Sequence, residues 1–160
     1  TVNHKAIGKM VYLTVNPSPK YAGKGSGTLV NGMHGSLDFH DQQWLGFLGE
    51  DIEVVIDLRE SSGIRKISCS FLENQGSWIF LPGQVIISIS EDGANFDEAG
   101  VFRGEMVERE GSRVKEYTVA TKGQSIRFVK ISARNAGPCP GWHPGAGQES
   151  WLFVDEVVVK

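Results

Sequence analysis

The chain has 160 residues, a length that fits one ordinary domain with a buried core. Hydrophobic residues make up 40% of it, charged residues 22%, and the formal net charge is −3. This balance argues against a disordered chain and gives no basic face for nucleic acid, and no apolar run approaches the roughly 20 residues of a transmembrane helix. We therefore expect a single soluble domain, residues 1–160, without nucleic-acid or membrane partners.

The first predicted elements are short strands. Apolar residues recur at every second position in several runs, which is the period of a β-strand. The runs cover residues 52–58, 64–72, 85–90, 114–119, 125–133 and 152–159. Turn sequences such as Pro82-Gly83 and Lys122-Gly123 separate them, and no amphipathic helix of ten residues interrupts them. The pattern predicts an all-β, antiparallel sandwich rather than a βαβ array.

Two packed sheets imply a core drawn from alternate strand positions. Eight residues are predicted to be mostly buried: Val54, Ile56, Ile67, Phe71, Ile87, Ile89, Phe128 and Val157. The chain has two cysteines, too few for a disulfide framework. Cys69 lies within an expected strand, so we favour two unpaired thiols over a bridge between Cys69 and Cys139.

Three stretches are rich in aromatic, polar and glycine residues and do not have the strand pattern: residues 32–51, 73–82 and 135–150. Loops on a rigid β scaffold commonly carry function, so a site is expected there. Each stretch holds one tryptophan, Trp44, Trp78 or Trp142, whereas Trp151 begins a strand and is assigned to the core. We expect the three loop tryptophans to gather at one end of the sandwich.

Loop tryptophans have two interpretations. A flat ring can pack on the apolar face of a sugar, with a few directed hydrogen bonds beside it, or it can plug the end of the sandwich. For the first interpretation, the hydrogen-bonding candidates in or next to these stretches are His40, Asn74, Gln75, Arg134, Asn135 and His143.

Several motifs resemble, in order, the discoidin (coagulation-factor type C) sandwich that family 32 carbohydrate-binding modules share. They are Ala6-Ile7-Gly8-Lys9, Leu29-Val30-Asn31-Gly32, Val54-Val55-Ile56-Asp57-Leu58, Ile87-Ser88-Ile89-Ser90-Glu91-Asp92-Gly93-Ala94-Asn95-Phe96 and Ile126-Arg127-Phe128-Val129-Lys130-Ile131. Residues 75–82, 139–147 and 151–157 resemble more closely the C-terminal module of bacterial chitobiases, the β-N-acetylhexosaminidases of glycoside hydrolase family 20. The resemblance implies a discoidin-like, jelly-roll-like fold.

The resemblance also implies a function. We expect a non-catalytic module, cut from the C-terminal end of a larger exported glycosidase, that targets its catalytic domain to glycans with terminal galactose or N-acetylhexosamine. Periplasm or cell surface is the expected location. One alternative is an accessory module that packs on the catalytic domain of the same chain without binding sugar. Adhesion to proteins or membranes, as in animal discoidin domains, is disfavoured by the net charge of −3.

Discoidin-type modules often hold a structural calcium ion, which requires six to eight oxygen ligands. The matching positions are the side chains of Asn31, Ser36 and Glu156 with main-chain carbonyls near Leu29 and His34. Asn31 replaces the usual Asp of the family and removes one charge, and Asn31-Gly32 is also a common turn pair that needs no metal. Both a calcium site and a plain turn are therefore open.

Catalysis is not expected. Asp155 and Glu156 are adjacent on an expected strand, so their side chains should point to opposite faces and not toward one glycosidic bond. The (β/α)₈ barrel of family 20 takes about 250 residues with alternating helices, which this chain lacks. The loop acids Asp38, Asp41, Glu50 and Asp51 are interpreted as solvated, and the histidines have no zinc-binding spacing.

Overall fold

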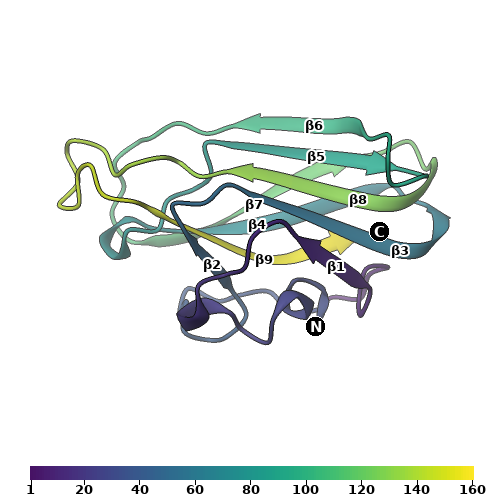
Figure 1. Ribbon diagram of the computed structural model, residues 1–160, viewed down its shortest axis with the longest axis horizontal. Helices are drawn as coiled ribbons and strands as arrows, with labels where there is room; N and C mark the ends of the chain where they lie inside the picture. Colours follow the sequence, from purple (N-terminus) through teal and green to yellow (C-terminus); the bar gives the residue numbers. More distant parts are fainter.

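The structure is a computed structural model that describes all 160 residues, and it contains two antiparallel β-sheets (Figure 1). The five-stranded sheet has the order β1 (Met10–Leu13), β3 (Ile52–Gly63), β8 (Ser125–Arg134), β5 (Gln84–Ser90) and β6 (Asp97–Arg103). The four-stranded sheet has the order β2 (Leu45–Leu48), β9 (Trp151–Val159), β4 (Lys66–Asn74) and β7 (Ser112–Ala120). Three short 3-10 turns complete the elements: η1 (Pro19–Tyr21), η2 (Ser26–Val30) and η3 (Gln75–Ser77). The predicted all-β sandwich is confirmed.

Three strands escaped the sequence pattern, and each has a physical reason. β1 has four residues at the edge of a sheet, with only Val11 buried, so it shows no alternation. β2, Leu-Gly-Phe-Leu, buries three residues in a row inside a stretch predicted as a loop, residues 32–51. β6 is an edge strand without a buried residue that begins with two acids and includes a glycine.

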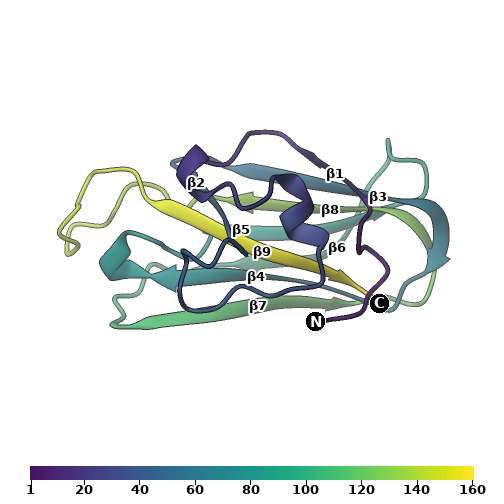
Figure 2. The ribbon, with the colours of Figure 1, turned by 90° about the horizontal axis from the view of Figure 1, so that it is seen from below.

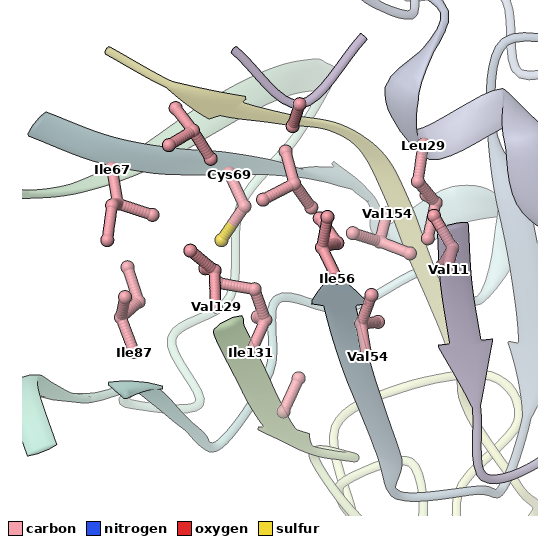
Figure 3. Close-up of a cluster of buried hydrophobic side chains, with 14 of the residues drawn as sticks. Val11, Leu29, Val54, Ile56, Ile67, Cys69, Ile87, Val129, Ile131 and Val154 are labelled. Carbon is pink, nitrogen blue, oxygen red and sulfur yellow. The ribbon is translucent and has the colours of Figure 1, made fainter. Parts of the chain in front are cut away.

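The main core fills the space between the sheets (Figure 3). Seven of the eight residues predicted to be buried belong to it, but Phe128 is half-buried and lies outside it. The reason is a register shift between β3 and β8, after which the buried positions of β8 are Val129, Ile131 and Ala133. Cys69 lies in the core, and both cysteines are free, as predicted.

A second, smaller cluster lies on the outer face of the four-stranded sheet. Trp44, Leu72, Ile79 and Phe153 form it, and Tyr21 and Phe39 pack against it. Phe153 faces outward because its neighbours Leu152 and Val154 face the main core. Residues 14–44, purple to dark blue in Figure 2, lie across this face and cover most of the cluster.

The end of the sandwich that carries residues 135–150 lies opposite the end where β9 and the chain finish (Figures 1 and 2). No helix in the structure has the length and apolar character needed to cross a membrane.

Candidate functional site

The loop end of the sandwich contains a hollow of about 300 Å³. Its walls come from three segments that are distant in sequence: residues 74–76 around η3, residues 108–111 before β7, and residues 142–144 of the long loop before β9. The hollow therefore brings together four of the residues singled out from sequence, Asn74, Gln75, Trp142 and His143.

Gln75 ties two of the walls together. Its side chain is buried, and its amide donates a hydrogen bond to the carbonyl of Val107 at 2.8 Å while its Oε1 accepts one from the Arg109 amide at 2.9 Å. Both ends of the amide are thus used on one peptide segment. Gln75 is a structural member of the site that fixes residues 107–109, rather than a free ligand contact.

His143 ties the third wall to the first. Its ring is buried, Nε2 donates to the Gln75 carbonyl at 2.6 Å, and Nδ1 accepts from the Gly145 amide at 2.9 Å. Because both ring nitrogens are bonded to the backbone, the Nε2–H tautomer is assigned and neither nitrogen is free for a ligand. The predicted role of His143 as a direct hydrogen-bonding partner is corrected to a positioning role.

Trp142 is the aromatic surface of the hollow. Trp142 is 40% exposed, and its ring centre lies 6.3 Å from that of Phe80, with the two ring planes at 53° to each other. Tryptophan rings with one free face are the groups on which the apolar face of a sugar packs.

Polar groups with free hydrogen-bonding capacity surround this ring. The Asn74 Oδ1 caps η3 by accepting from the Ser77 amide, which leaves the Asn74 Nδ2 without a partner. The half-exposed Arg109 guanidinium is 3.8 Å from a carboxylate oxygen of buried Glu73, which already accepts from Arg113 at 2.7 Å. Arg109 is therefore held near the hollow but retains donors for a ligand.

Trp44 is not part of this hollow. It is 1% exposed, belongs to the outer cluster, and its Nε1 donates to the Ser36 carbonyl at 2.8 Å. For Trp44 the packing interpretation holds, because β2 and the 14–44 segment enclose the ring. Trp78 is half-buried beside His143, with ring centres 5.7 Å apart, and Trp151 is half-buried rather than part of the core.

Asn135 is buried at the base of the long loop. Its amide and carboxamide groups bond to Asp51, Gly137 and Ser150. The backbone amide and the side-chain carboxamide of Asn135 both hold the loop, so the predicted ligand contact is corrected here as well.

Arg134 is exposed and lines a different hollow of about 300 Å³ over the five-stranded sheet, with Asp51 and Gln84. His40 is exposed, pairs with Asp38 at 3.2 Å, and packs on Phe39. Neither residue lines the hollow at Trp142.

The residues of the predicted calcium site do not fit a hard cation. Glu156 is fully buried, and its carboxylate accepts from His4 Nε2 at 2.6 Å, from the Gly32 amide at 2.6 Å and from the Asn31 amide at 3.2 Å. N–H donors that converge on a carboxylate occupy the positions that a cation would take. The Asn31 Oδ1 accepts from the Met33 amide instead.

Ser36, the third side chain of the predicted calcium set, hydrogen bonds with Asp41 at 2.6 Å, and the His34 ring bonds to Asp155 rather than to Glu156. A bulge in β9 places the two adjacent acids, Asp155 and Glu156, opposite a single residue of β4, Ser70.

Asp155 and His34 perturb each other. Burial raises the pKa of the Asp155 carboxyl, and the hydrogen bond from His34 at 3.1 Å opposes that rise. The same hydrogen bond raises the pKa of His34. Both carboxylates bond to the segment that precedes β2: Asp155 to His34 and Gly35, and Glu156 to His4, Asn31 and Gly32. The prediction that the two side chains point to opposite faces is therefore wrong, because the bulge interrupts the strand alternation and puts both on the outer face of the sheet.

Sequence reasoning missed one of the three walls of the hollow, residues 108–111. Glu108, Arg109 and Glu110 resemble an ordinary charged surface turn, and the bonds from Gln75 and the ion pair with Glu73 hold them at the site. The available signal was the absence of a strand pattern in residues 104–111, which marks a loop but not its location.

At the level of sequence, no family model and no curated protein matches this chain. Solved structures with the same fold exist. Chitosan-binding module 1 of a chitosanase/glucanase from Paenibacillus sp. IK-5 superposes with a TM-score of 0.63 at 10% identity, covering 99% of this chain and 98% of that one. The Streptococcus pneumoniae fucose-binding module SpX-3 gives 0.61 at 17% identity, with 99% and 98% covered.

A third similar structure is CpGH89CBM32-4 from Clostridium perfringens in complex with GlcNAc-α-1,4-galactose, with a TM-score of 0.59 at 12% identity and 100% and 95% of the two chains covered. At these identities the likeness concerns the fold. The chain therefore has, over its full length, the β-sandwich fold of these carbohydrate-binding modules.

Proposed function

We propose that this chain is a glycan-binding module that acts without catalysis, and that its site is the hollow around Trp142. The observation that carries the proposal is a half-exposed tryptophan ring beside the free Asn74 amide and Arg109 guanidinium, in a hollow whose walls are fixed by buried hydrogen bonds. A rigid apolar platform with a few directed polar groups is the composition of a small-molecule site.

The chemistry suits a single terminal sugar. A pyranose would place its apolar face on the Trp142 ring and direct its hydroxyl or acetamido oxygens at Asn74 and Arg109. Since one ring and a few hydrogen bonds supply only a few kcal/mol after ordering costs, we expect monosaccharide Kd values on the order of 0.1 to 1 mM. Terminal galactose and N-acetylhexosamine are the proposed targets, and GlcNAc-α-1,4-galactose, the ligand in the similar CpGH89CBM32-4 structure, belongs to this chemical class.

Weak binding is sufficient for a tethered module. If the chain belongs to a larger secreted glycosidase of the chitobiase type, the catalytic domain and this module engage one glycan surface together, and effective concentration multiplies their affinities. The sequence motifs at residues 75–82, 139–147 and 151–157 support this parentage, and export to the periplasm or cell surface follows from it. The proposed role is to concentrate the enzyme at its substrate.

The test is a comparison of three single-aromatic variants. After a glycan array with the intact chain, binding of galactose and N-acetylglucosamine is measured by calorimetry for Trp142→Ala, Tyr12→Ala and Trp44→Ala. Trp142→Ala should weaken binding at least tenfold and change the melting temperature far less than Trp44→Ala, because Trp142 is 40% exposed whereas Trp44 is 1% exposed.

Tyr12→Ala is the matched control, since Tyr12 is 56% exposed on an edge strand away from the hollow. It should change neither quantity. Trp44→Ala should reduce the free energy of unfolding by about 3 to 5 kcal/mol, because it leaves a cavity under the 14–44 segment. Unaltered sugar affinity in Trp142→Ala would overturn the proposed site, and no array signal at all would favour an accessory module that packs on the catalytic domain.

A further inference from the structure

A second aromatic groove lies on the other side of the long loop. It has a volume of about 420 Å³ and is lined by Leu48, Trp78, Gly147, Gln148, Glu149 and Trp151. None of these residues lines the hollow at Trp142. The two hollows share the loop itself: residues 142–144 form a wall of the first, and residues 147–149 form a wall of the second.

Three neighbouring elements build the apolar floor of this groove. Leu48 of β2 pairs directly with Trp151 of β9, and the Trp151 amide donates to the Trp78 carbonyl at 2.8 Å. The floor continues the outer cluster, since Trp151 packs against that cluster and its ring centre lies 5.1 Å from that of Tyr21. Leu48 is 39% exposed and both tryptophans are half-buried, so the rings present apolar area to solvent.

Trp78 is held in this position at a conformational cost. Its φ is 66° and its ψ is 22°, the left-handed region that bulky L-residues rarely adopt, at the C-cap of η3 where glycine is usual. The ring packs edge-on against His143 and so closely over Gly145 that a Cβ there would lie 2.7 Å from it. The conformation therefore places a tryptophan between the two hollows.

The rim of the groove has unused polar groups. The side chains of Gln148 and Glu149 are exposed and form no hydrogen bond within the chain, although the backbone of Gln148 is held by bonds to Gly145 and Cys139. The Glu149 carboxylate lies over Gly49, where a Cβ would come within 2.7 Å of it. The Gln148 amide can donate to and accept from sugar hydroxyl groups, and the Glu149 carboxylate can accept from them.

We infer that this groove is a second saccharide site, which binds a sugar ring on Trp78 and Trp151 with hydroxyl contacts to Gln148 and Glu149. The inference deepens the proposed function and shares with it the class of ligand, but it rests on a separate set of residues. Two sites on one rigid end make the module bivalent toward a surface that displays many glycan ends, and bivalence raises the apparent affinity without any new contact.

The test follows the four indole N–H signals by NMR while galactose, N-acetylglucosamine and fucose are added separately to the intact chain. Two groups of signals should shift with at least one of these sugars: Trp142, and Trp78 together with Trp151. The Trp44 indole, bonded to Ser36, is the internal control and should stay fixed.

Two variants separate the sites. Gln148→Ala should weaken the response of Trp78 and Trp151 at least threefold and leave that of Trp142 unchanged, because the Gln148 side chain supports nothing in the fold. Trp142→Ala removes the Trp142 signal and should leave the response of Trp78 and Trp151 unchanged. If Trp142→Ala abolishes the shifts of Trp78 and Trp151, there is one site and the inference fails while the proposed function stands.

If only Trp78 and Trp151 respond, the inference stands and the Trp142 site fails. If Trp142 alone responds, the second groove is not a site for these sugars and the inference is overturned. No response from any ring contradicts both. Retention on galactose- or N-acetylglucosamine-coated beads should also fall in both single variants, about threefold in Gln148→Ala and at least tenfold in Trp142→Ala, because bivalence needs both sites.

Discussion

Two buried polar clusters hold chain segments against this sandwich, and they have opposite consequences for the surface. At the loop end, Gln75 and His143 exchange neutral hydrogen bonds with the backbone of neighbouring loops and leave an exposed tryptophan over a hollow. Beside the N-terminal segment, Glu156 accepts from His4, Asn31 and Gly32 and is completely enclosed. Buried polar residues therefore do not by themselves mark a site.

The difference lies in what remains unsatisfied. Both carboxylate oxygens of Glu156 have a protein donor, so this cluster only ties residues 4 and 31–32 to β9. We call the carboxylate and its three donors the Glu156 clasp. In the loop-end cluster the hydrogen bonds of Gln75 and His143 only position the surrounding loops, so the Trp142 ring and the donors of Arg109 and Asn74 are left free for a ligand. A binding site therefore has free groups held in position, whereas in the Glu156 clasp every polar group already has a partner within the protein.

The largest effect in this comparison is expected from a substitution that breaks the Glu156 clasp. Glu156→Gln puts an amide donor against the amides of Asn31 and Gly32, and the free energy of unfolding should fall by about 3 kcal/mol, since a buried charge-assisted network is lost. Denaturant unfolding measures it. Sugar binding by the folded fraction should be unchanged.

Asp38→Asn is the matched control for that substitution. Asp38 also pairs with a histidine, but both side chains are largely exposed, at 70% for Asp38 and 62% for His40. No measurable loss of stability is expected, because exposed ion pairs contribute little. Equal effects from the two carboxylates would show that enclosure of Glu156 has no energetic consequence.

A smaller effect tests the loop-end cluster. Gln75→Ala leaves the Val107 carbonyl and the Arg109 amide without their partner, which should cost about 1 to 3 kcal/mol of stability. Because residues 107–109 then lose their position, sugar affinity should fall along with stability, unlike in Glu156→Gln. Gln124→Ala, in an exposed turn, serves as control. Full sugar affinity in Gln75→Ala would contradict the positioning role.

The fold was predictable where apolar residues recur at every second position in the sequence. The central strands β3, β4, β5, β8 and β9 were expected on that pattern, as in Val54 and Ile56. β3 and β8 also alternate in burial, whereas β4 and β9 are buried on both faces. The edge strands β1 and β6 have one buried residue or none and could not be recognised. Phe128 was misplaced by the register shift beside it, since an irregularity reverses the face of following residues.

The site was only partly predictable. Trp142, Gln75 and His143 were identified because aromatic and amide residues in long loops stand out against strand patterns. Their roles were not accessible, since a buried His143 with both nitrogens bonded has the same sequence appearance as an exposed one. Trp44 was grouped with them for the same reason, although β2 places it under the 14–44 segment.

The ion pair between Arg127 and Asp57 is intermediate in exposure between the buried Glu156 clasp and the exposed pair of Asp38 and His40. The Arg127 guanidinium donates to both oxygens of Asp57 at 2.9 and 3.0 Å, and this holds the pKa of that carboxyl below its usual range. The folded state then binds fewer protons than the unfolded state as the pH falls. The pair should contribute about 0.5 to 1 kcal/mol above pH 4, and this contribution is lost as the pH drops through the lowered pKa.

Thermal unfolding of the wild type and Asp57→Asn at several pH values measures this contribution. The wild type should have a higher Tm than Asp57→Asn at pH 6, and this difference in Tm should become smaller below pH 4. The difference in Tm between the wild type and Arg127→Gln should also become smaller below pH 4, because this substitution removes the cation that lowers the pKa of the Asp57 carboxyl. A gap independent of pH would assign the effect to packing between β3 and β8 instead.

The last prediction is that calcium has no effect on the melting temperature. Three N–H donors already point at Glu156, so an ion could bind only by displacing His4 or the amides of Asn31 and Gly32. Neither a chelator nor millimolar calcium should then change the Tm of the wild type, since a ligand that does not bind the folded state cannot stabilise it. The same titration on Glu156→Gln is the control for unspecific salt effects. A calcium-dependent rise in Tm that disappears in Glu156→Gln would mean that the carboxylate exchanges its protein donors for an ion, and the clasp would then be the ion-free state of a metal site.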